Sequence, residues 1–522
     1  MENSSPCSAG DHVINKDTLC KENNKIGNLS SESIINSESD AVIIEDIVNV
    51  SGKDTQIVLT TNGVKLISPK DRINKKKEGK IGPFLEWRDV ISASKDPKST
   101  EQSHQWILNY IHHGSKSIVH HRCLKVHDKN GNSDKLITAI QKQCSKVVGR
   151  PKKLFILINP IGGACKGRQI YQKAAEPLFK LASVETHVVV TEKSKHALEI
   201  GETHDFSQYD GVVIVGGDGL YQEFLQGLTI QTQKKSGINY DDPNAELSKL
   251  NIPIGIIPAG TGNGLTYMIN GIQHAETAVL NIIRGEQHRG QIFIVHSGSK
   301  FLCVSALAFG YGFFSDYVKR TEELRWMKKA RYAYTFIGML SKKKRFFQAE
   351  LQYRLKLKAN DSSGGNEQGE QQKSDWIIHK NETKNYNCIY SLQGELVDAG
   401  DHNIVDPYGS HVMLGAGTGC GHFALFKTMM YTVFGKKINS SSNLDLIDRV
   451  TDFKIKVLRD EQGGSERISG ARAREIELEH LIDIDGEVIH LESLDMTVRV
   501  QPSLTLIYGV KKKQVTHKFQ HD

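Results

Sequence analysis

The sequence predicts three folded parts: a small β domain over residues 41–148, a parallel α/β domain over 151–290, and a mostly antiparallel β domain over 291–515. The first observation is the length of 522 residues, which is more than one compact core usually contains. The second is that strand-like and helix-like patterns alternate only in the middle part, which is typical of a parallel sheet. The third is that apolar and polar residues alternate along runs in the last part, which is typical of antiparallel strands.

The first part begins with a polar segment. Residues 1–40 are rich in Ser, Asn, Asp and Glu and poor in large apolar residues, so we expect disorder there. Strand-like runs follow at 41–48, 55–61 and 116–126, and residues 136–147 have the spacing of an amphipathic helix. This pattern predicts a small β domain that ends in a helix.

The middle part opens after Gly149-Arg150-Pro151. A helix is expected near 196–202, between two of the predicted strands. The predicted strands are 154–159, 186–192, 210–215 and 252–258. This alternation predicts strands that run parallel to one another.

The last part is dominated by alternating runs. A helical segment, 322–340, interrupts them, and the polar composition of 359–375 predicts a disordered insertion. The runs that predict strands include 301–309, 349–358, 453–458, 476–484 and 497–510.

Composition narrows the class of protein. The chain is 38% hydrophobic and 24% charged, as is usual for a soluble globular protein, and no apolar run approaches the ~18 residues of a transmembrane helix. The N-terminus has no basic start and no apolar core, so it does not resemble a secretory signal. The eight cysteines are scattered without CxxC spacing, which predicts reduced thiols in a cytoplasmic protein rather than a zinc site or a disulfide framework.

Basic residues are clustered although the net charge is only +7. The clusters are Lys75–Lys77 with Lys80, Lys342–Arg345 next to Phe346-Phe347, and Lys511–Lys513. One interpretation is ordinary solvated surface. The other is attraction to an anionic membrane surface, to which the protein would bind peripherally. No motif supports binding to nucleic acid.

Three glycine-rich turns are expected where strands of the middle part end. The first, NPIGGACKGR, runs from Asn159 to Arg168 and carries Lys166. The second, GGDG, has an acid, Asp218, at its centre, and the third, PAGTGNG, ends at Gly264. Each turn is followed by residues at helical spacing. None of them matches a P-loop, a GxGxxG fingerprint or the motif set of protein kinases.

These turns together predict an anion-binding floor. Glycine lets the backbone approach a ligand closely, and a helix N-terminus offers free N–H groups and partial positive charge to a phosphate. In open α/β sheets, ligands bind beyond the carboxyl ends of the strands. One such turn alone would fit a simple tight turn and a binding site equally well, but three in one domain favour a shared binding site.

Asp218 has two interpretations at this place. It can cap a helix, a position that suits aspartate. It can instead face the anion site, where a carboxylate would repel phosphate unless it binds a metal ion or accepts a proton from an attacking hydroxyl. Phosphoryl transfer needs both functions. Glu223, just over one helical turn further on, could help to hold Mg²⁺ or orient a nucleotide.

In this order and spacing, NPIGG, VGGDGLYQE and PAGTGNG resemble the catalytic domain shared by diacylglycerol, sphingosine and ceramide kinases. Within this superfamily the chain is most similar to the ceramide kinases, over roughly 85–345 and at a DGE near the C-terminus. The resemblance implies an α/β nucleotide-binding domain, a β-sandwich lipid-binding domain and a preceding pleckstrin-homology-like domain. It also implies a kinase that uses ATP and Mg²⁺ to convert ceramide to ceramide 1-phosphate. A calmodulin partner is implied by the resemblance alone.

The resemblance implies roles for individual residues. Asp218 would be the base that accepts the proton of the lipid hydroxyl, with Gly216, Gly217 and Gly219 beside the lipid, and Asp316 would line the headgroup pocket. Mg²⁺ would be held mainly through the ATP phosphates, with Asp218 as a candidate ligand. The residues expected around the nucleotide are Asn159, Pro160, Ile161, Gly162, Gly163, Lys166, Thr191, Lys195, Glu223, Gly260, Thr261, Gly262, Arg325, Arg331, Asp485, Gly486 and Glu487.

The chain departs from the ceramide kinases in three ways. It lacks their CxxxCxxC cluster and has only Cys388 and Cys420 in this half, Gln291 stands where they have Asp, and 377–440 matches them poorly. The acceptor therefore stays open between ceramide and sphingosine or another lipid, and Asp316 would suit a cationic amine. A rival of another class is a non-catalytic membrane lipid sensor.

Overall fold

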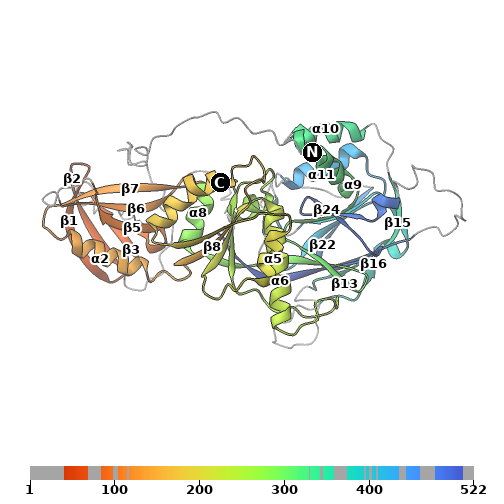
Figure 1. Cartoon of the computed structure of the whole chain (residues 1–522), viewed down its shortest axis with the longest axis horizontal. Coiled ribbons are helices and arrows are strands. Elements are labelled where there is room, and N and C mark those ends of the chain that lie inside the picture. Colours follow the sequence, from red (N-terminus) through yellow and green to blue (C-terminus); the bar gives the residue numbers. More distant parts are fainter. Residues whose placement is uncertain are drawn as a thin grey trace, which may run out of the picture. The chain divides into compact units, whose positions relative to one another are not determined.

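The structure is a computed structural model. It describes residues 40–68, 84–97, 104–114, 117–327, 330–340, 345–357, 373–392, 395–398, 403–406, 409–433, 443–458 and 476–509. The chain divides into two compact units (Figure 1), which are Met1–His112 with His121–Val147, and His113–His120 with Val148–Asp522. Among the described helices, none is both long and apolar enough to cross a bilayer.

The first unit is an antiparallel sheet with a helix. Its strands follow the order β4-β3-β2-β1-β7-β6-β5. The elements are β1 (Val42–Val50), β2 (Lys53–Thr60), β3 (Gly63–Ile67), β4 (Phe84–Glu86), a 3₁₀ turn η2 (Trp87–Asp89), β5 (Val90–Lys95), β6 (Gln105–His113), β7 (Val119–Asp128) and α2 (Ser133–Cys144). The predicted β domain with a terminal helix is confirmed in this outline.

Local sequence explains this sheet. Ser51 and Gly52 both have positive φ, the backbone that a two-residue hairpin turn between β1 and β2 requires. Leu136 and Ile140 lie one helical turn apart on α2 and are fully buried, and Trp106 is fully buried in the same core cluster. The helix therefore covers the sheet through one apolar stripe.

The second unit begins with alternating strands and helices. The order β11-β10-β8-β9 forms a parallel sheet. The elements are β8 (Lys153–Ile158), α3 (Gly167–Ile170), a π-helical turn η3 (Tyr171–Ala175), α4 (Glu176–Leu181), β9 (Glu185–Val190), α5 (His196–Thr203), β10 (Gly211–Gly216), α6 (Asp218–Lys235), β11 (Pro253–Pro258), α7 (Gly264–Asn270) and α8 (Ala275–Arg284). The predicted parallel α/β part is confirmed.

β10 is the central strand of this part. β8 and β11 flank the strand, and every residue from Gly211 to Gly216 is buried, as is usual for a parallel sheet covered on both faces. This explains the uninterrupted apolar run that marked it in the sequence. Since the three strands are parallel and paired in register, their carboxyl ends and the glycine turns after them lie at one edge of the sheet.

The remaining elements of the second unit are mostly strands. The elements are β12 (Gln287–Ser297), β13 (Lys300–Ser305), β14 (Ala308–Gly312), α9 (Phe313–Glu323), η4 (Arg325–Met327), α10 (Ala330–Leu340), β15 (Phe347–Leu355), β16 (Ile377–Ile378), η6 (His379–Asn381), β17 (Lys384–Tyr386), β18 (Cys388–Leu392), β19 (Glu395–Asp398), β20 (Asn403–Asp406), β21 (Val412–Gly417), α11 (His422–Val433), β22 (Leu444–Val457), β23 (Leu481–Ile484), β24 (Glu487–His490) and β25 (Asp495–Tyr508). The helical segment expected over 322–340 is divided between α9, η4 and α10.

The long strand β25 joins the two parts of this unit. It pairs antiparallel with β12 and β22, and its end pairs parallel with β11 at Pro253 and Ile254. One sheet therefore continues from the parallel strands into the β-rich part. The boundary that the sequence suggested at residue 290 falls inside β12.

Several expected segments lie wholly or partly outside the described residues. These are 1–39 of the N-terminus, 359–372 of the insertion, 510–515 at the end of the last part, and the lysine clusters around 75–80, 342–344 and 511–513. Lys373, at the end of the expected insertion, is placed and pairs with buried Asp452 at 2.9 Å.

The core of the α/β part gives the first prediction. Phe224 on α6 is fully buried and packs edge-to-face on Phe206, with ring centroids 5.5 Å apart. Phe224→Ala should lower the free energy of unfolding by about 3–5 kcal/mol, because it leaves a cavity in a packed core. Val188→Thr, at a partly exposed position on β9, is the control and should change it by less than about 0.5 kcal/mol. Urea denaturation measures both, and equal effects would show that this cluster is not the core.

Candidate active site

The three glycine turns touch one another. A Cβ on Gly163 would lie 2.5 Å from the carbonyl oxygen of Ala259, and one on Gly260 would lie 2.5 Å from Cα of Gly217. Gly260 of the third turn therefore lies against both of the other turns. Glycine is required at these positions because backbone packs directly on backbone, which leaves no room for a side chain.

The first turn is organised by its own asparagine. Oδ1 of Asn159 accepts hydrogen bonds from the N–H groups of Ile161 and Gly162, both at 3.0 Å. Such a bond from a side chain to the backbone two residues on is an Asx turn. Pro160 lies inside the turn, and Lys166, which directly precedes α3, has an exposed side chain. The position of Asn159 around a nucleotide stays a prediction, and in the structure its side chain shapes the turn.

Asp218 links the second turn to the third. Its Oδ2 accepts the N–H of Gly264 at 2.8 Å and its Oδ1 accepts the N–H of Leu265 at 3.0 Å. These are the first two residues of α7. Asp218 is itself the first residue of α6, and its side chain makes no capping bond to that helix. It is a cap, as one interpretation held, but of a different helix.

The environment makes this carboxylate more basic than usual. Burial raises the pKa of Asp218, and the bonds from Leu265 and Gly264 offset this only in part. A carboxylate that is fixed by two donors and has a raised pKa is suited to accept a proton from a nearby hydroxyl.

The third turn leaves its middle residues accessible. Asn263, in the left-handed region, accepts the Gly260 N–H at 2.9 Å through Oδ1 and donates to its carbonyl at 3.0 Å through Nδ2. Between them, Thr261 is half-buried and Gly262 is exposed. The turn is thus rigid at its base and open towards solvent.

Glu223 lies on α6, beyond Asp218. It accepts the backbone N–H of Lys195, which directly precedes α5 and has a left-handed backbone. Burial and repulsion from Glu487 raise the pKa of Glu223. The Thr191 hydroxyl donates to the Ile158 carbonyl at 3.4 Å. Among the three predicted nucleotide-binding residues Thr191, Lys195 and Glu223, a hydrogen bond therefore joins Lys195 and Glu223 directly.

Asp485 of the DGE holds a loop. Its carboxylate accepts the Ser305 hydroxyl at 2.6 Å and three consecutive backbone N–H groups, all at 2.8 Å, from Ala306, Leu307 and Ala308. Burial nevertheless raises the pKa of Asp485 to about 6. The side chain is fully engaged by this loop, so its role here is to position the loop.

That loop reaches the site through Leu307. A Cβ on Gly264 would lie 2.9 Å from Cδ2 of Leu307, so the leucine packs against the start of α7. Gly264 is the residue that donates to Asp218. Asp485, the loop and α7 thus form a continuous series of contacts that ends at the candidate base.

Glu487, the first residue of β24 in the β-rich part, lies against the second turn. A Cβ on Gly219 would lie 2.1 Å from its Oε1, so the carboxylate rests on that glycine. Burial and repulsion from Glu322 raise the pKa of Glu487, and Arg325 acts in the opposite direction. Gly486 has the positive φ of 85° that this tight return requires.

The two arginines lie in different elements. Arg325 in η4 is exposed, pairs with Glu322 and lies near Glu487. Arg331 in α10 donates to the Tyr332 hydroxyl at 2.9 Å and stacks on that ring. The structure brings Arg325 to the Glu487 cluster, and it places no described contact between Arg331 and the glycine turns.

Asp316 on α9 has a partner that the sequence did not indicate. Arg345 donates to both of its carboxylate oxygens, at 2.9 Å and 2.7 Å, and both side chains are largely buried. The two residues are 29 positions apart, so no helical spacing could have indicated the pair. Glu322 and Leu307 were missed for the same reason, since only the fold brings them to the site.

No group of three or more His, Cys, Asp or Glu side chains among the described residues is arranged to hold a metal ion. Burial raises the pKa of both Glu223 and Glu487, and the negative charge of Glu487 raises that of Glu223 further. A cation bound between them and a phosphate would relieve that repulsion, so these two carboxylates fit a Mg²⁺ ion held mainly by a ligand.

Residues 153–295 match the family model described as "Diacylglycerol kinase catalytic domain". This segment is similar to the catalytic domains of diacylglycerol kinases. The resemblance to this kinase superfamily that the three glycine turns predicted is therefore confirmed. The matched range contains all three turns, Asp218 and Glu223.

Curated relatives point the same way. Human ceramide kinase is 38% identical over 199 residues, which are 38% of this chain and 37% of that protein. Mouse ceramide kinase is 36% identical over 228 residues, 43% of each chain. Sphingosine kinase 1 of Arabidopsis thaliana is 35% identical over 190 residues, 35% of this chain and 36% of that protein. The matches span less than half of each relative.

A solved structure of a diacylglycerol kinase from Bacillus anthracis str. Sterne aligns with 69% of this chain and 98% of its own, at 13% identity and a TM-score of 0.42. A likeness at this level supports no assignment.

Asp485 gives the prediction for the site. Its pKa of about 6 in the folded state exceeds the unfolded value of about 3.9. The stability that this group contributes is thus fully present below about pH 3.9 and is lost as the pH rises through about 6. Relative to Asp485→Asn, which does not titrate, the wild-type free energy of unfolding should fall by roughly 3 kcal/mol between about pH 4 and 7.

Urea denaturation at several pH values measures this difference. Asp205→Asn is the matched control, because bonds from Ser207 lower the pKa of Asp205 and its contribution must change in the opposite direction. A wild-type minus Asp485→Asn difference that stays flat across this range would show that Asp485 is not buried against the loop as described.

Proposed function

We propose that the protein is a lipid kinase that transfers the γ-phosphoryl group of ATP to the primary hydroxyl of ceramide and forms ceramide 1-phosphate. The observation that carries the proposal is the placement of Asp218. Its carboxylate is held by two N–H groups of α7 at the point where the three glycine turns meet. A base fixed beside an anion-binding floor is what transfer of phosphate to a hydroxyl needs.

The reaction would use these residues as follows. Asp218 accepts the proton of the lipid hydroxyl while that oxygen forms a bond to the γ-phosphorus, and the bond from the γ-phosphorus to the bridging oxygen of ADP breaks. The backbone N–H groups of the turns, with Lys166 and Arg325, would stabilise the phosphates. Mg²⁺ held by the ATP phosphates, with Glu223 and Glu487 near it, would neutralise their charge.

The pairing of Asp316 supports a neutral acceptor. The sphingosine headgroup carries a cationic amine, whereas the corresponding nitrogen of ceramide is a neutral amide. A free carboxylate would favour the amine, but Arg345 binds both oxygens of Asp316. The names of the human and mouse relatives favour ceramide as well. Sphingosine is the alternative, since plant relatives are named sphingosine kinases.

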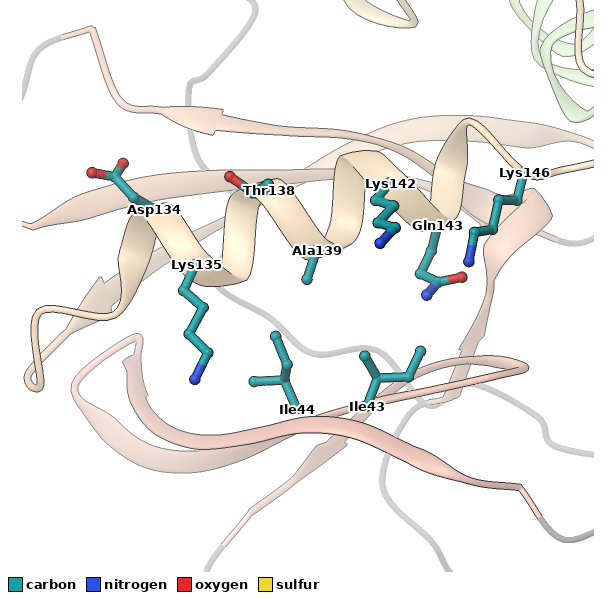
Figure 2. Close-up of a pocket in the computed structure, with 9 residues that line it drawn as sticks. All are labelled: Ile43, Ile44, Asp134, Lys135, Thr138, Ala139, Lys142, Gln143 and Lys146. Atoms are coloured by element: carbon teal, nitrogen blue, oxygen red, sulfur yellow. The ribbon is translucent and has the colours of Figure 1, made fainter.

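The first unit would serve as a pleckstrin-homology-like module for an anionic membrane surface. An open groove of about 540 Å³ lies between β1 and α2 (Figure 2). Lys135, Lys142 and Lys146 extend from one side of α2 towards Ile43 and Ile44 (Figure 2). Basic side chains above an apolar floor suit anionic lipid, to which each would contribute on the order of 1 kcal/mol.

The β-rich part of the second unit would be a β-sandwich lipid-binding domain, and the protein would act at the cytoplasmic face of a membrane as a peripheral enzyme. The rival is a non-catalytic lipid sensor. Asp218 argues against a sensor, because a sensor has no need of a basic carboxylate on an anion-binding floor.

Asp218→Asn tests the base directly. The full-length protein is incubated with labelled ATP, Mg²⁺ and ceramide, sphingosine or diacylglycerol in mixed micelles. We expect ceramide to be labelled preferentially, and kcat to fall by about 10²–10⁴ in the variant because general base catalysis is lost. Asp205→Asn, an exposed aspartate of the same part, should keep wild-type activity. Circular dichroism establishes that each variant folds.

The outcomes separate the hypotheses. Labelling of another lipid with the same loss in Asp218→Asn would keep the mechanism and change the acceptor. Labelling that survives in a folded Asp218→Asn variant would contradict the role of the base. No labelling of any lipid by the folded wild-type protein would favour the sensor.

The Arg345–Asp316 pair predicts selectivity. Arg345→Gln frees the Asp316 carboxylate, so the ratio of kcat/KM for sphingosine to that for ceramide should rise by about tenfold, equivalent to ~1.4 kcal/mol. Asp316→Asn in the same background should remove the gain. Arg320→Gln on α9 is the matched control and should leave the ratio unchanged. A ratio unaffected by Arg345→Gln would show that this pair does not read the headgroup.

A further inference from the structure

The outer face of α10 is apolar. Tyr334, Ile337 and Leu340 are 60%, 67% and 47% exposed, and they recur at the three-residue spacing that places them on one side of the helix. Ala330 and Ala333 are exposed as well. No charged residue is exposed on α10, whereas Thr335 and Met339 on its other side are buried. The helix therefore presents apolar residues both inwards and outwards.

A neighbouring helix extends this face. Phe336 of α10 stacks on Phe426 of α11 with ring centroids 3.7 Å apart, and Figure 1 shows the two helices close together. Phe423, one turn earlier on α11, is 66% exposed. Trp326, just before α10, is 77% exposed. We call Trp326, Tyr334, Ile337, Leu340 and Phe423 the apolar patch.

Charge in the sequence indicates what covers the patch. The segments on both sides of α10 are basic, Lys328-Lys329 before it and Lys342-Lys343-Lys344 after it. Apolar and aromatic residues between lysines are the composition of helices that lie in the interface of an anionic membrane, where Trp and Tyr sit at the level of the headgroups. A protein partner would need no such basic flanks.

The patch is joined to the proposed acceptor site. The Tyr317 hydroxyl of α9 donates to the Tyr332 carbonyl of α10 at 2.9 Å. Asp316 is the residue before Tyr317, and Arg345, which binds it, follows the basic segment after α10. A membrane that contacts α10 would thus lie next to the residues that we assign to the lipid headgroup.

We propose that the apolar patch inserts into the surface of an anionic bilayer, so that the acceptor lipid is taken directly from the membrane. The proposal rests on the proposed function, because it assumes that the acceptor is a bilayer lipid. It assigns membrane contact to the second unit, in addition to any contact by the first.

Vesicle binding tests the patch without turnover. Full-length protein is floated with vesicles of phosphatidylcholine and phosphatidylserine, with no ATP present. Tyr334→Ser, Ile337→Ser and Leu340→Ser combined should weaken partitioning by about tenfold or more, because apolar area no longer leaves water. Val188→Ser, Ile378→Ser and Leu458→Ser combined remove apolar residues of 39%, 39% and 37% exposure elsewhere in the same unit and are the control.

The result shows whether a bilayer or a second copy of the chain covers the apolar patch. Equal partitioning of wild type and the patch variant, or an equal loss in the control, would overturn the proposal. A wild-type dimer that becomes a monomer in the patch variant by sedimentation velocity would show that a second copy of the chain covers the patch, and would also overturn it. Thermal unfolding verifies that both triple variants are folded.

Trp326 provides a second readout. Its emission should shift to the blue when vesicles are added, because the exposed ring leaves water. Trp326→Phe should abolish the shift, since Trp87 and Trp106 are already buried and the half-buried Trp376 is stacked by Arg354 and Lys454. A shift that persists in Trp326→Phe would place the membrane contact elsewhere.

Activity separates this proposal from the proposed function. The patch variant should phosphorylate a monomeric short-chain ceramide as fast as wild type, and ceramide in vesicles about tenfold more slowly. Equal rates on vesicles would overturn the patch. Failure of the wild-type protein to phosphorylate any lipid would overturn the kinase, whereas the vesicle-binding result would stand independently.

Discussion

The direct contact of three backbone turns is the constraint on which the rest of the site depends. Gly260 lies against both Gly163 and Gly217, and no residue with a Cβ fits between them. The contact is possible because β8, β10 and β11 are parallel and end at one edge. It brings the start of α7 within hydrogen-bonding distance of Asp218, so the packing of the turns and the placement of the candidate base have a single cause.

The β-rich part completes this arrangement. β25 continues the parallel sheet beyond β11, which fixes the strands of the second unit in one sheet. The hairpin of β23 and β24 then carries Asp485 and Glu487 back to the turns. Asp485 orders the loop that packs on α7, and Glu487 rests on Gly219. The parallel part and the β-rich part therefore contribute to one candidate site because they share the sheet, which brings together Asp218 and Glu487 although they are more than 250 residues apart in the sequence.

The sequence predicted what local chemistry determines. Glycine at strand ends, the β-branched run before Gly216 and the acid at Asp218 located the turns, and the family match covers them. The sequence could not predict long-range contacts. Only the fold shows that Asp218 caps α7 rather than α6, and that Arg345 binds Asp316. Residues 476–479 are helical although their run alternates, because only Leu481–Ile484 finds a partner strand. The alternation of apolar and polar residues cannot by itself show whether a partner strand is present.

A crystal structure with Mg²⁺ and a non-hydrolysable ATP analogue tests the central claim most directly. The account predicts that the phosphates lie across the three glycine turns, with the γ-phosphate next to Asp218 and with Glu487 near the metal ion. Asp218 should keep its bonds to Gly264 and Leu265 in that complex. Phosphates bound away from the turns, or a carboxylate of Asp218 that faces away from the γ-phosphate, would contradict the account.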